Sequence, residues 1–260
     1  MTNSNRSPRE AIDLFRAERL NAMYLLRVFA AWEEWHVPGD EADGQLVLRP
    51  IAGRDEAPQL LMFSDEAAVA AARAHADTQN LGEPLITASG DAIFAALSDD
   101  FATIQINPFA GADLYYAREQ FPRLREWGQI ATVERALADV LRTGSGLDTI
   151  RNFDGYFIAV NREGLQNIAL VPDDFGRRLA AIFTARDALE AYLDENGGPD
   201  TQPFGMTGKQ LFTALSKIPL DGIVFNPAGP AAYGFATAFI ELLMRNVPPL
   251  DQLPEGFEVR

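Results

Sequence analysis

The sequence contains no cysteine, and this absence excludes disulfides, thiolate catalysis and cysteine-based zinc or iron–sulfur sites. Histidine is almost as scarce, because His36 and His75 are the only two in the chain. They do not form the H-x-x-x-H or H-E-x-x-H spacing that would place two metal ligands on one face of a helix. We therefore predict that the protein has no metal site and no cofactor.

Basic residues are few in relation to acidic ones. The chain has 22 lysines and arginines against 37 aspartates and glutamates, which gives a net charge of −15. Such a surface repels phosphate backbones and anionic lipids, so neither nucleic acid nor a membrane is expected as a partner. A cationic protein surface would be attracted, although an acidic surface also serves simply to keep a protein soluble.

Long apolar runs are missing as well, since no uninterrupted stretch reaches the ~18 residues of a membrane span. The closest approach, residues 228–244, is interrupted by Pro230 and Glu241 and is predicted to be a packed helix. Residues 1–10 lack the apolar segment of a secretory signal. Together with the absence of cysteine, these features lead us to expect a cytoplasmic protein.

What the sequence does contain is one pattern that occurs twice. A stretch from Phe63–Ser64 to Asn107–Pro108 matches a stretch from Phe183–Thr184 to Asn226–Pro227. Matching positions lie about 120 residues apart, which indicates an internal duplication. The predicted organisation is a first copy at 1–143, a linker at 144–154 that begins with Gly144–Gly146, and a second copy at 155–260.

Each copy combines apolar runs of strand length with helical patterns. In the first copy we predict strands at 23–29, 45–51 and 59–63, and a mostly helical segment at 113–142. Strands both precede the helices and alternate with them, so the fold class is α/β (α+β-like), with a mixed sheet flanked by helices in each copy. The closing helix, predicted at 231–245, has a wide apolar face that would pack on the sheet or, alternatively, on a second copy of the chain in a homodimer.

The repeated residues also carry a resemblance to a known family. An apolar strand, F-[ST] opening a helix, a short capped helix and a strand ending in N-P resemble the SseB-like domain (the N-terminal domain of SseB) of bacterial proteins. The residues that carry the resemblance are Phe63–Ser64, Ile106–Pro108, Phe183–Thr184 and Phe225–Pro227. The resemblance implies two tandem SseB-like copies, an α/β fold, a bacterial cytoplasmic setting and no enzymatic activity. It supplies no catalytic residues.

The two Asn-Pro steps are the first candidate binding sites. Asn107–Pro108 and Asn226–Pro227 each follow a predicted strand, and ligands of open α/β sheets gather at the carboxyl ends of strands. An asparagine side chain offers both a donor and an acceptor there. The structural alternative is that asparagine and proline simply form the turn, since Asn-Pro favours turn initiation.

The string from Trp32 to His36 is the second candidate. It falls in a segment, 32–43, that we interpret as an insertion in the first copy, because Tyr156 of the second copy is matched with Tyr24. Trp32 and Trp35 could anchor a partner protein, because tryptophan is enriched in binding hot spots. They could equally pack against the sheet edge or between the copies.

No catalytic motif accompanies these features, because neither G-x-S-x-G, G-x-G-x-x-G nor a complete phosphate-binding loop is present. We therefore predict a non-enzymatic bacterial protein that binds another protein. The alternative is a small-molecule-binding or sensing module that uses the Asn-Pro loops at the strand ends.

Overall fold

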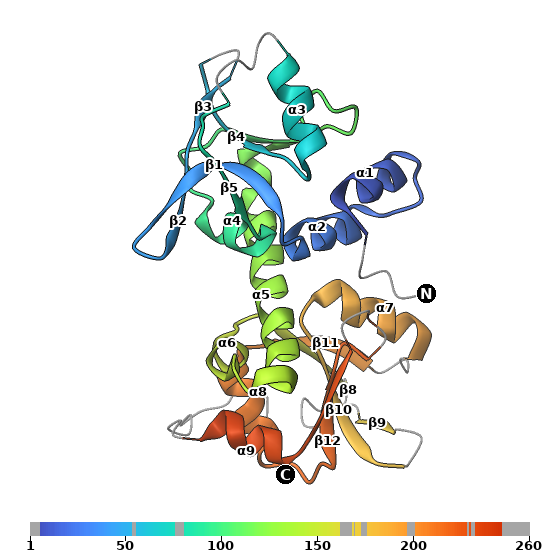
Figure 1. Ribbon diagram of the computed structural model, residues 1–260. Helices are drawn as coiled ribbons and strands as arrows, with labels where there is room; N and C mark the ends of the chain where they lie inside the picture. Colours follow the sequence, from blue (N-terminus) through green and yellow to red (C-terminus); the bar gives the residue numbers. More distant parts are fainter. Residues whose placement is uncertain are drawn as a thin grey trace. The chain divides into compact units, whose positions relative to one another are not determined.

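The computed structural model describes residues 6–53, 56–75, 81–161, 168, 170–172, 176–196, 201–227, 229 and 232–245 (Figure 1). The chain divides into two compact units, Met1–Ala131 (unit 1) and Thr132–Arg260 (unit 2). The division falls within the long helix α5 (Phe121–Thr143). The segment 144–154, predicted as a linker, instead lies in unit 2, where it contains helix α6 (Leu147–Asn152).

Unit 1 begins with two helices, α1 (Pro8–Arg16) and α2 (Ala22–Ala31). Its strands are β1 (Trp35–Ala42), β2 (Gln45–Leu48), β3 (Ile51–Ala52), β4 (Pro58–Met62), β5 (Leu85–Ala88), β6 (Thr103–Ile106) and β7 (Leu114–Ala117). Helix α3 (Glu66–Ala74) follows β4, helix α4 (Gly90–Ala96) follows β5, and a 3-10 turn, η2 (Arg118–Gln120), leads into α5. The strands form two sheets, of order β2-β1-β5 and β3-β4-β6-β7.

The described part of unit 2 continues from α6 with one sheet and three further helices. Its strands are β8 (Tyr156–Asn161), β9 (Leu170–Pro172), β10 (Arg178–Phe183), β11 (Thr201–Met206), β12 (Gly222–Phe225) and β13 (Tyr233–Ala236). Its helices after α6 are α7 (Arg186–Asn196), α8 (Gly208–Leu215) and α9 (Ala238–Met244). The strand order is β11-β8-β10-β12-β13, and β9 pairs with β10.

The same pairings recur in both units. In unit 1, β5 pairs antiparallel with β1, a bridge from His36 to Phe63 joins β1 to β4, β4 runs parallel to β6, and β6 pairs antiparallel with β7. In unit 2, β11, β8, β10, β12 and β13 follow one another with the same directions. The predicted α/β class, with mixed sheets and helices, is confirmed. A common origin of the two units by duplication stays a prediction that would account for these shared pairings.

Several predicted elements differ from the structure. Residues 23–29, predicted as a strand, belong to helix α2, because Leu25, Leu26 and Phe29 are buried at helical spacing. Residues 233–236, predicted as helix, form strand β13 at the edge of the sheet. Both errors have one physical cause, since a short apolar run does not distinguish a buried helix from a buried strand.

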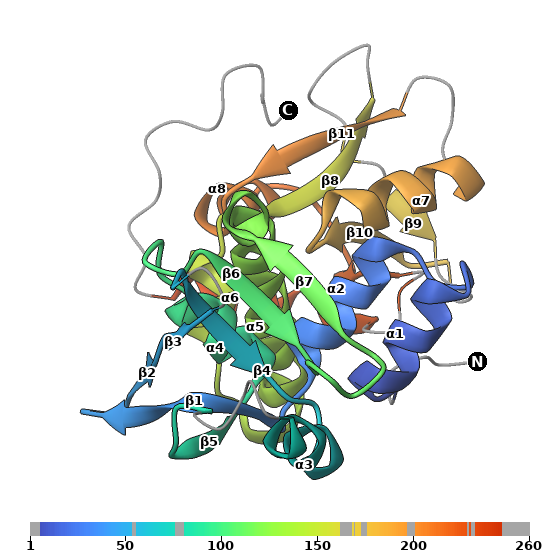
Figure 2. The ribbon, with the colours of Figure 1, turned by 90° about the horizontal axis from the view of Figure 1, so that it is seen from above.

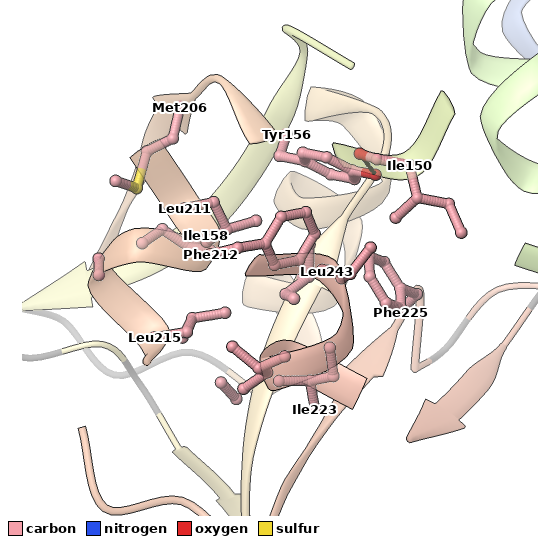
Figure 3. Packing of buried hydrophobic residues seen from close by; sticks show 14 of the residues in the cluster. Ile150, Tyr156, Ile158, Met206, Leu211, Phe212, Leu215, Ile223, Phe225 and Leu243 are labelled. Carbon is pink, nitrogen blue, oxygen red and sulfur yellow. Dashed lines mark hydrogen bonds between the residues drawn. The ribbon is translucent and has the colours of Figure 1, made fainter. Parts of the chain in front are cut away.

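The apolar face of the closing helix is used within unit 2. Helix α9 buries Phe239, Ile240 and Leu243 in the core that Figure 3 shows from close by. Of the two uses predicted for this apolar face, these three side chains follow the first, which is packing within the chain rather than in a homodimer. None of the described helices is long and apolar enough to cross a membrane.

Trp35 and Tyr156 hold matching places in the two units. Trp35 opens β1 opposite Ala88, and Tyr156 opens β8 opposite Met206. The Trp35 indole Nε1 donates to the Phe29 carbonyl at 2.9 Å, and the Tyr156 hydroxyl donates to the Ile150 carbonyl at 2.8 Å. The matching of Tyr156 with Tyr24 was therefore wrong. Trp35 lies not in an insertion but in a strand with a counterpart.

We expect Tyr156→Phe to lower the free energy of unfolding by about 1 kcal/mol near neutral pH, because the Ile150 carbonyl loses its donor. Burial raises the pKa of Tyr156 well above its ordinary value of 10.0. As the pH rises past that value, the unfolded chain releases this proton and the folded chain keeps it, so the wild type loses stability. Urea unfolding at about pH 7 and about pH 11 should show that the difference in free energy of unfolding between the wild type and Tyr156→Phe is smaller at the higher pH. If the difference between the wild type and the variant did not change with pH, this explanation of the Tyr156 hydroxyl would be wrong.

Candidate functional site

Asn107 lies where β6 ends and is fully buried. Its backbone N–H donates to the Met62 carbonyl at 2.8 Å, which places it beside the end of the parallel strand β4. The side-chain Oδ1 accepts the Ser64 backbone N–H at 2.8 Å, and Nδ2 donates to Ser64 Oγ at 2.9 Å. Its φ is 51°, a left-handed conformation that asparagine adopts more readily than most residues.

Asn226 makes the same contacts in unit 2, at the end of β12. Its backbone N–H donates to the Ile182 carbonyl at 2.8 Å, and its φ is 46°. Oδ1 accepts the Thr184 backbone N–H at 3.0 Å, and Nδ2 donates to Thr184 Oγ1 at 3.0 Å. We call the pairs Asn107–Ser64 and Asn226–Thr184 the asparagine latches, because each ties the ends of two parallel strands together.

The latches determine what the predicted Asn-Pro sites can do. Both amides are nearly inaccessible to solvent and are hydrogen-bonded within the fold. Pro108 is buried and Pro227 is half-buried. The structure thus places these four residues at the carboxyl ends of parallel strands, as predicted, but in the geometry of a structural turn.

A carboxylate completes each latch and comes from a different element in each unit. In unit 1, Asp65 accepts from Ser64 Oγ at 3.0 Å and also caps α3 by accepting the Ala68 N–H at 2.7 Å. In unit 2, Glu134 of α5 accepts from Thr184 Oγ1 at 2.8 Å and from Asn226 Nδ2 at 3.1 Å. Sequence reasoning missed Glu134. One sequence difference could have indicated it: Ala185 follows Thr184, whereas Asp65 follows Ser64, so the carboxylate of unit 2 has to come from elsewhere in the chain.

The tryptophans of the second candidate site separate in the structure. Trp35 is fully buried in unit 1, with its ring edge against Phe29 at a centroid distance of 5.5 Å. Trp32 is half-buried at the end of α2, and its carbonyl accepts the Gly90 N–H at 2.7 Å. Trp35 thus packs inside unit 1, as the structural alternative predicts, whereas Trp32 is only partly buried and its indole Nε1 is inaccessible to solvent.

A different pair of aromatic rings is exposed on unit 1. Phe109 and Tyr115 are 42% and 58% exposed. Phe109 stacks on His75, which follows α3, with ring centroids 3.9 Å apart. Tyr115 of β7 lies opposite Gln105, which lies opposite Leu61 of β4. Leu61 packs with Ala68 and other residues of α3, so Tyr115 points to the same side of the sheet as α3.

The backbone at Phe109 is strained. Its φ is 65°, which costs a bulky side chain about 1–2 kcal/mol. The residue follows Asn107 and Pro108 in the loop that Figure 1 shows in green beside α3. A strained backbone that keeps an apolar ring at the surface does not serve the core. Neither Phe109 nor Tyr115 stood out in the sequence, because strain and exposure depend on the fold.

Other chemistry is sparse in the described part of the chain. No group of three or more metal-ligating side chains comes together among those residues. His36 and His75 lie on separate elements, and the His36 Nδ1 is 3.3 Å from Thr87 Oγ1. The aromatic pair, rather than a titratable cluster, is the feature that distinguishes this surface.

Comparison with protein-family models finds no family that matches this sequence. Comparison with curated proteins likewise finds no match. The resemblance to SseB-like domains therefore stays a prediction.

Proposed function

We propose that this protein is a non-enzymatic, bacterial, cytoplasmic protein of SseB-like type that acts by binding another protein. The observation that carries the proposal is the exposure of two aromatic rings of unit 1: Tyr115, which points to the α3 side of the β3-β4-β6-β7 sheet, and Phe109, which stacks on His75 after α3. Aromatic side chains, which are large, apolar and partly exposed, are enriched among the residues that anchor protein interfaces.

The strain at Phe109 supports the same role. Asparagine or glycine would fit its backbone conformation at lower cost, as asparagine does at position 107. Strained backbone positions cluster at functional sites. Trp32, whose carbonyl accepts from Gly90 at the start of α4, stays a separate candidate for contact with a partner, whereas Trp35 is in the core.

The small-molecule alternative has less support from the geometry. The amides of Asn107 and Asn226 would have to break hydrogen bonds to Ser64 and Thr184 before they could bind a ligand. Because buried polar groups left without partners cost about 1–3 kcal/mol each, such a ligand would have to offset that cost.

The test is affinity capture of the tagged full chain from a lysate of the cells that make it. We expect the double variant Phe109→Asn with Tyr115→Thr to lose at least about tenfold of the captured partner, the size expected when a hot spot is removed. Asparagine suits the left-handed backbone at position 109 and threonine suits a strand, so the variant should remain folded.

A matched control is Leu141→Asn, because Leu141 of α5 is also exposed, at 59%, but lies in unit 2. This control should capture as much partner as the wild type. Equal capture by the double variant and the wild type would show that the aromatic pair is not the binding surface.

A further inference from the structure

A second surface of unit 1 lies at the hairpin of β1 and β2. Asp43 and Gly44 form its turn with φ values of 54° and 73°, as a two-residue turn of type I′ requires. Figures 1 and 2 both show this blue hairpin reaching outward from the rest of unit 1. Residues 40–45 are all exposed.

The outer edge of β2 is open. β2 is the last strand of the sheet β2-β1-β5. Among the described residues, the backbone of Gln45–Leu48 makes no hydrogen bond outside its pairing with β1. Every second residue of such an edge directs its N–H and C=O outward, ready to pair with another strand. Helix α4 lies near β2, but Val47 is still 50% exposed.

The charge at the hairpin restricts what can pair there. Glu41 and Asp43 are exposed, and neither forms an ion pair with another described residue. Asp40 is already paired with Arg49. Glu41 lies on β1 opposite Leu46 and Asp43 lies in the turn, so both carboxylates flank the uncharged strand β2. A cationic strand would meet the opposite charge, in keeping with the net charge of −15.

We propose that the open edge of β2 binds an extended, lysine- or arginine-rich segment of a partner protein as an added strand. Main-chain hydrogen bonds along Gln45–Leu48 hold the segment, as in other cases of strand addition. Glu41 and Asp43 attract its cationic side chains, and Val47 contacts an apolar one. The inference rests on the proposed function, protein binding, but uses a surface separate from Phe109 and Tyr115.

The test uses the full chain and a short peptide of alternating lysine and valine, with binding followed by fluorescence anisotropy. We expect it to bind at least about tenfold more tightly than a peptide of alternating glutamate and valine, and less tightly as salt is raised. Hydrogen exchange should slow at the amides of Gln45–Leu48 when the lysine peptide is added. It should not slow at β5, the opposite edge of the same sheet.

Two variants that remove the same charge at different places distinguish binding at the β2 edge from general electrostatic attraction to the acidic protein. Glu41→Gln with Asp43→Asn removes two charges and keeps a turn residue that suits the backbone. Asp194→Asn with Glu195→Gln removes the same charge from exposed positions of α7 in unit 2. Only the first variant should weaken binding of the lysine peptide, by about tenfold.

Three outcomes would overturn the proposal. They are no binding of the lysine peptide, equal weakening by both charge variants, and binding without slowed exchange at Gln45–Leu48. The variant Phe109→Asn with Tyr115→Thr should bind the peptide as the wild type does. Its behaviour in lysate capture therefore judges the proposed function separately.

Discussion

Replacing Gly90 by alanine should destabilise unit 1 by about 4 kcal/mol or more, as when an inserted atom has no space. A Cβ at Gly90 would lie 1.9 Å from the Phe29 carbonyl oxygen, and that oxygen is backbone that cannot rotate away. The N–H of Gly90 also donates to the Trp32 carbonyl at 2.7 Å. The start of α4 therefore presses directly on the end of α2.

Gly208→Ala should have the same effect in unit 2. There a Cβ would lie 2.3 Å from the Arg151 carbonyl oxygen, and the Gly208 N–H donates to the Phe153 carbonyl at 2.7 Å. The start of α8 thus presses on the end of α6. Two glycines with the same close approach are what the predicted duplication would leave in both units.

Urea unfolding measures both effects. The tryptophans Trp32, Trp35 and Trp127 all lie in unit 1, so their fluorescence follows Gly90→Ala, while circular dichroism follows both variants. Gly234→Ala is the control, because nothing lies within 4 Å of a Cβ there. It should change stability by less than about 0.5 kcal/mol. If Gly90→Ala costs no more than this control, the close approach of α2 and α4 is wrong.

Asn226→Ala should destabilise unit 2 by about 3 kcal/mol, from two sources. The Thr184 N–H would be left buried without its acceptor at 3.0 Å, which costs about 1–3 kcal/mol. Alanine would also have to adopt a φ of 46°, which costs about 1 kcal/mol more than asparagine pays.

Asn226→Gly separates the two sources, because glycine accepts a positive φ without a steric cost. It should therefore be about 1 kcal/mol less destabilising than Asn226→Ala. Circular dichroism during urea unfolding gives both values, and hydrogen exchange at Thr184 should speed up in both variants. A loss under about 1 kcal/mol for Asn226→Ala would mean that the latch does not hold the strand ends.

The fold class followed from the sequence because the apolar runs and helix caps agree with the structure. Thr207, for example, caps α8 and forms the reciprocal pair with Gln210 that the T-x-x-Q spacing predicts. Leu25 and Phe29 were misassigned because their helix is short and apolar along much of its length. Nothing local distinguishes such a helix from a strand until a sheet forms beside it.

The candidate site shows a similar division. The repeated Asn-Pro steps correctly marked the ends of β6 and β12, because a turn residue after an apolar run is a local signal. Whether the amides face solvent or the fold depends on Ser64 and Thr184, more than 40 residues away. The exposure of Phe109 and Tyr115 depends on how segments distant in the sequence pack, such as Phe109 on His75, and no sequence pattern states it.

If the asparagine latches hold the fold while the exposed aromatic rings bind a partner, loss of a latch and loss of the rings should have separate effects. The measurement is the amount of captured partner per folded molecule for the wild type, for Asn107→Gly, and for Phe109→Asn with Tyr115→Thr. We expect Asn107→Gly to be less stable yet to capture partner normally once folded, and the aromatic variant to be as stable as the wild type but to lose the partner. Normal capture by the aromatic variant, or loss of the partner by folded Asn107→Gly, would show that the two roles are not divided in this way.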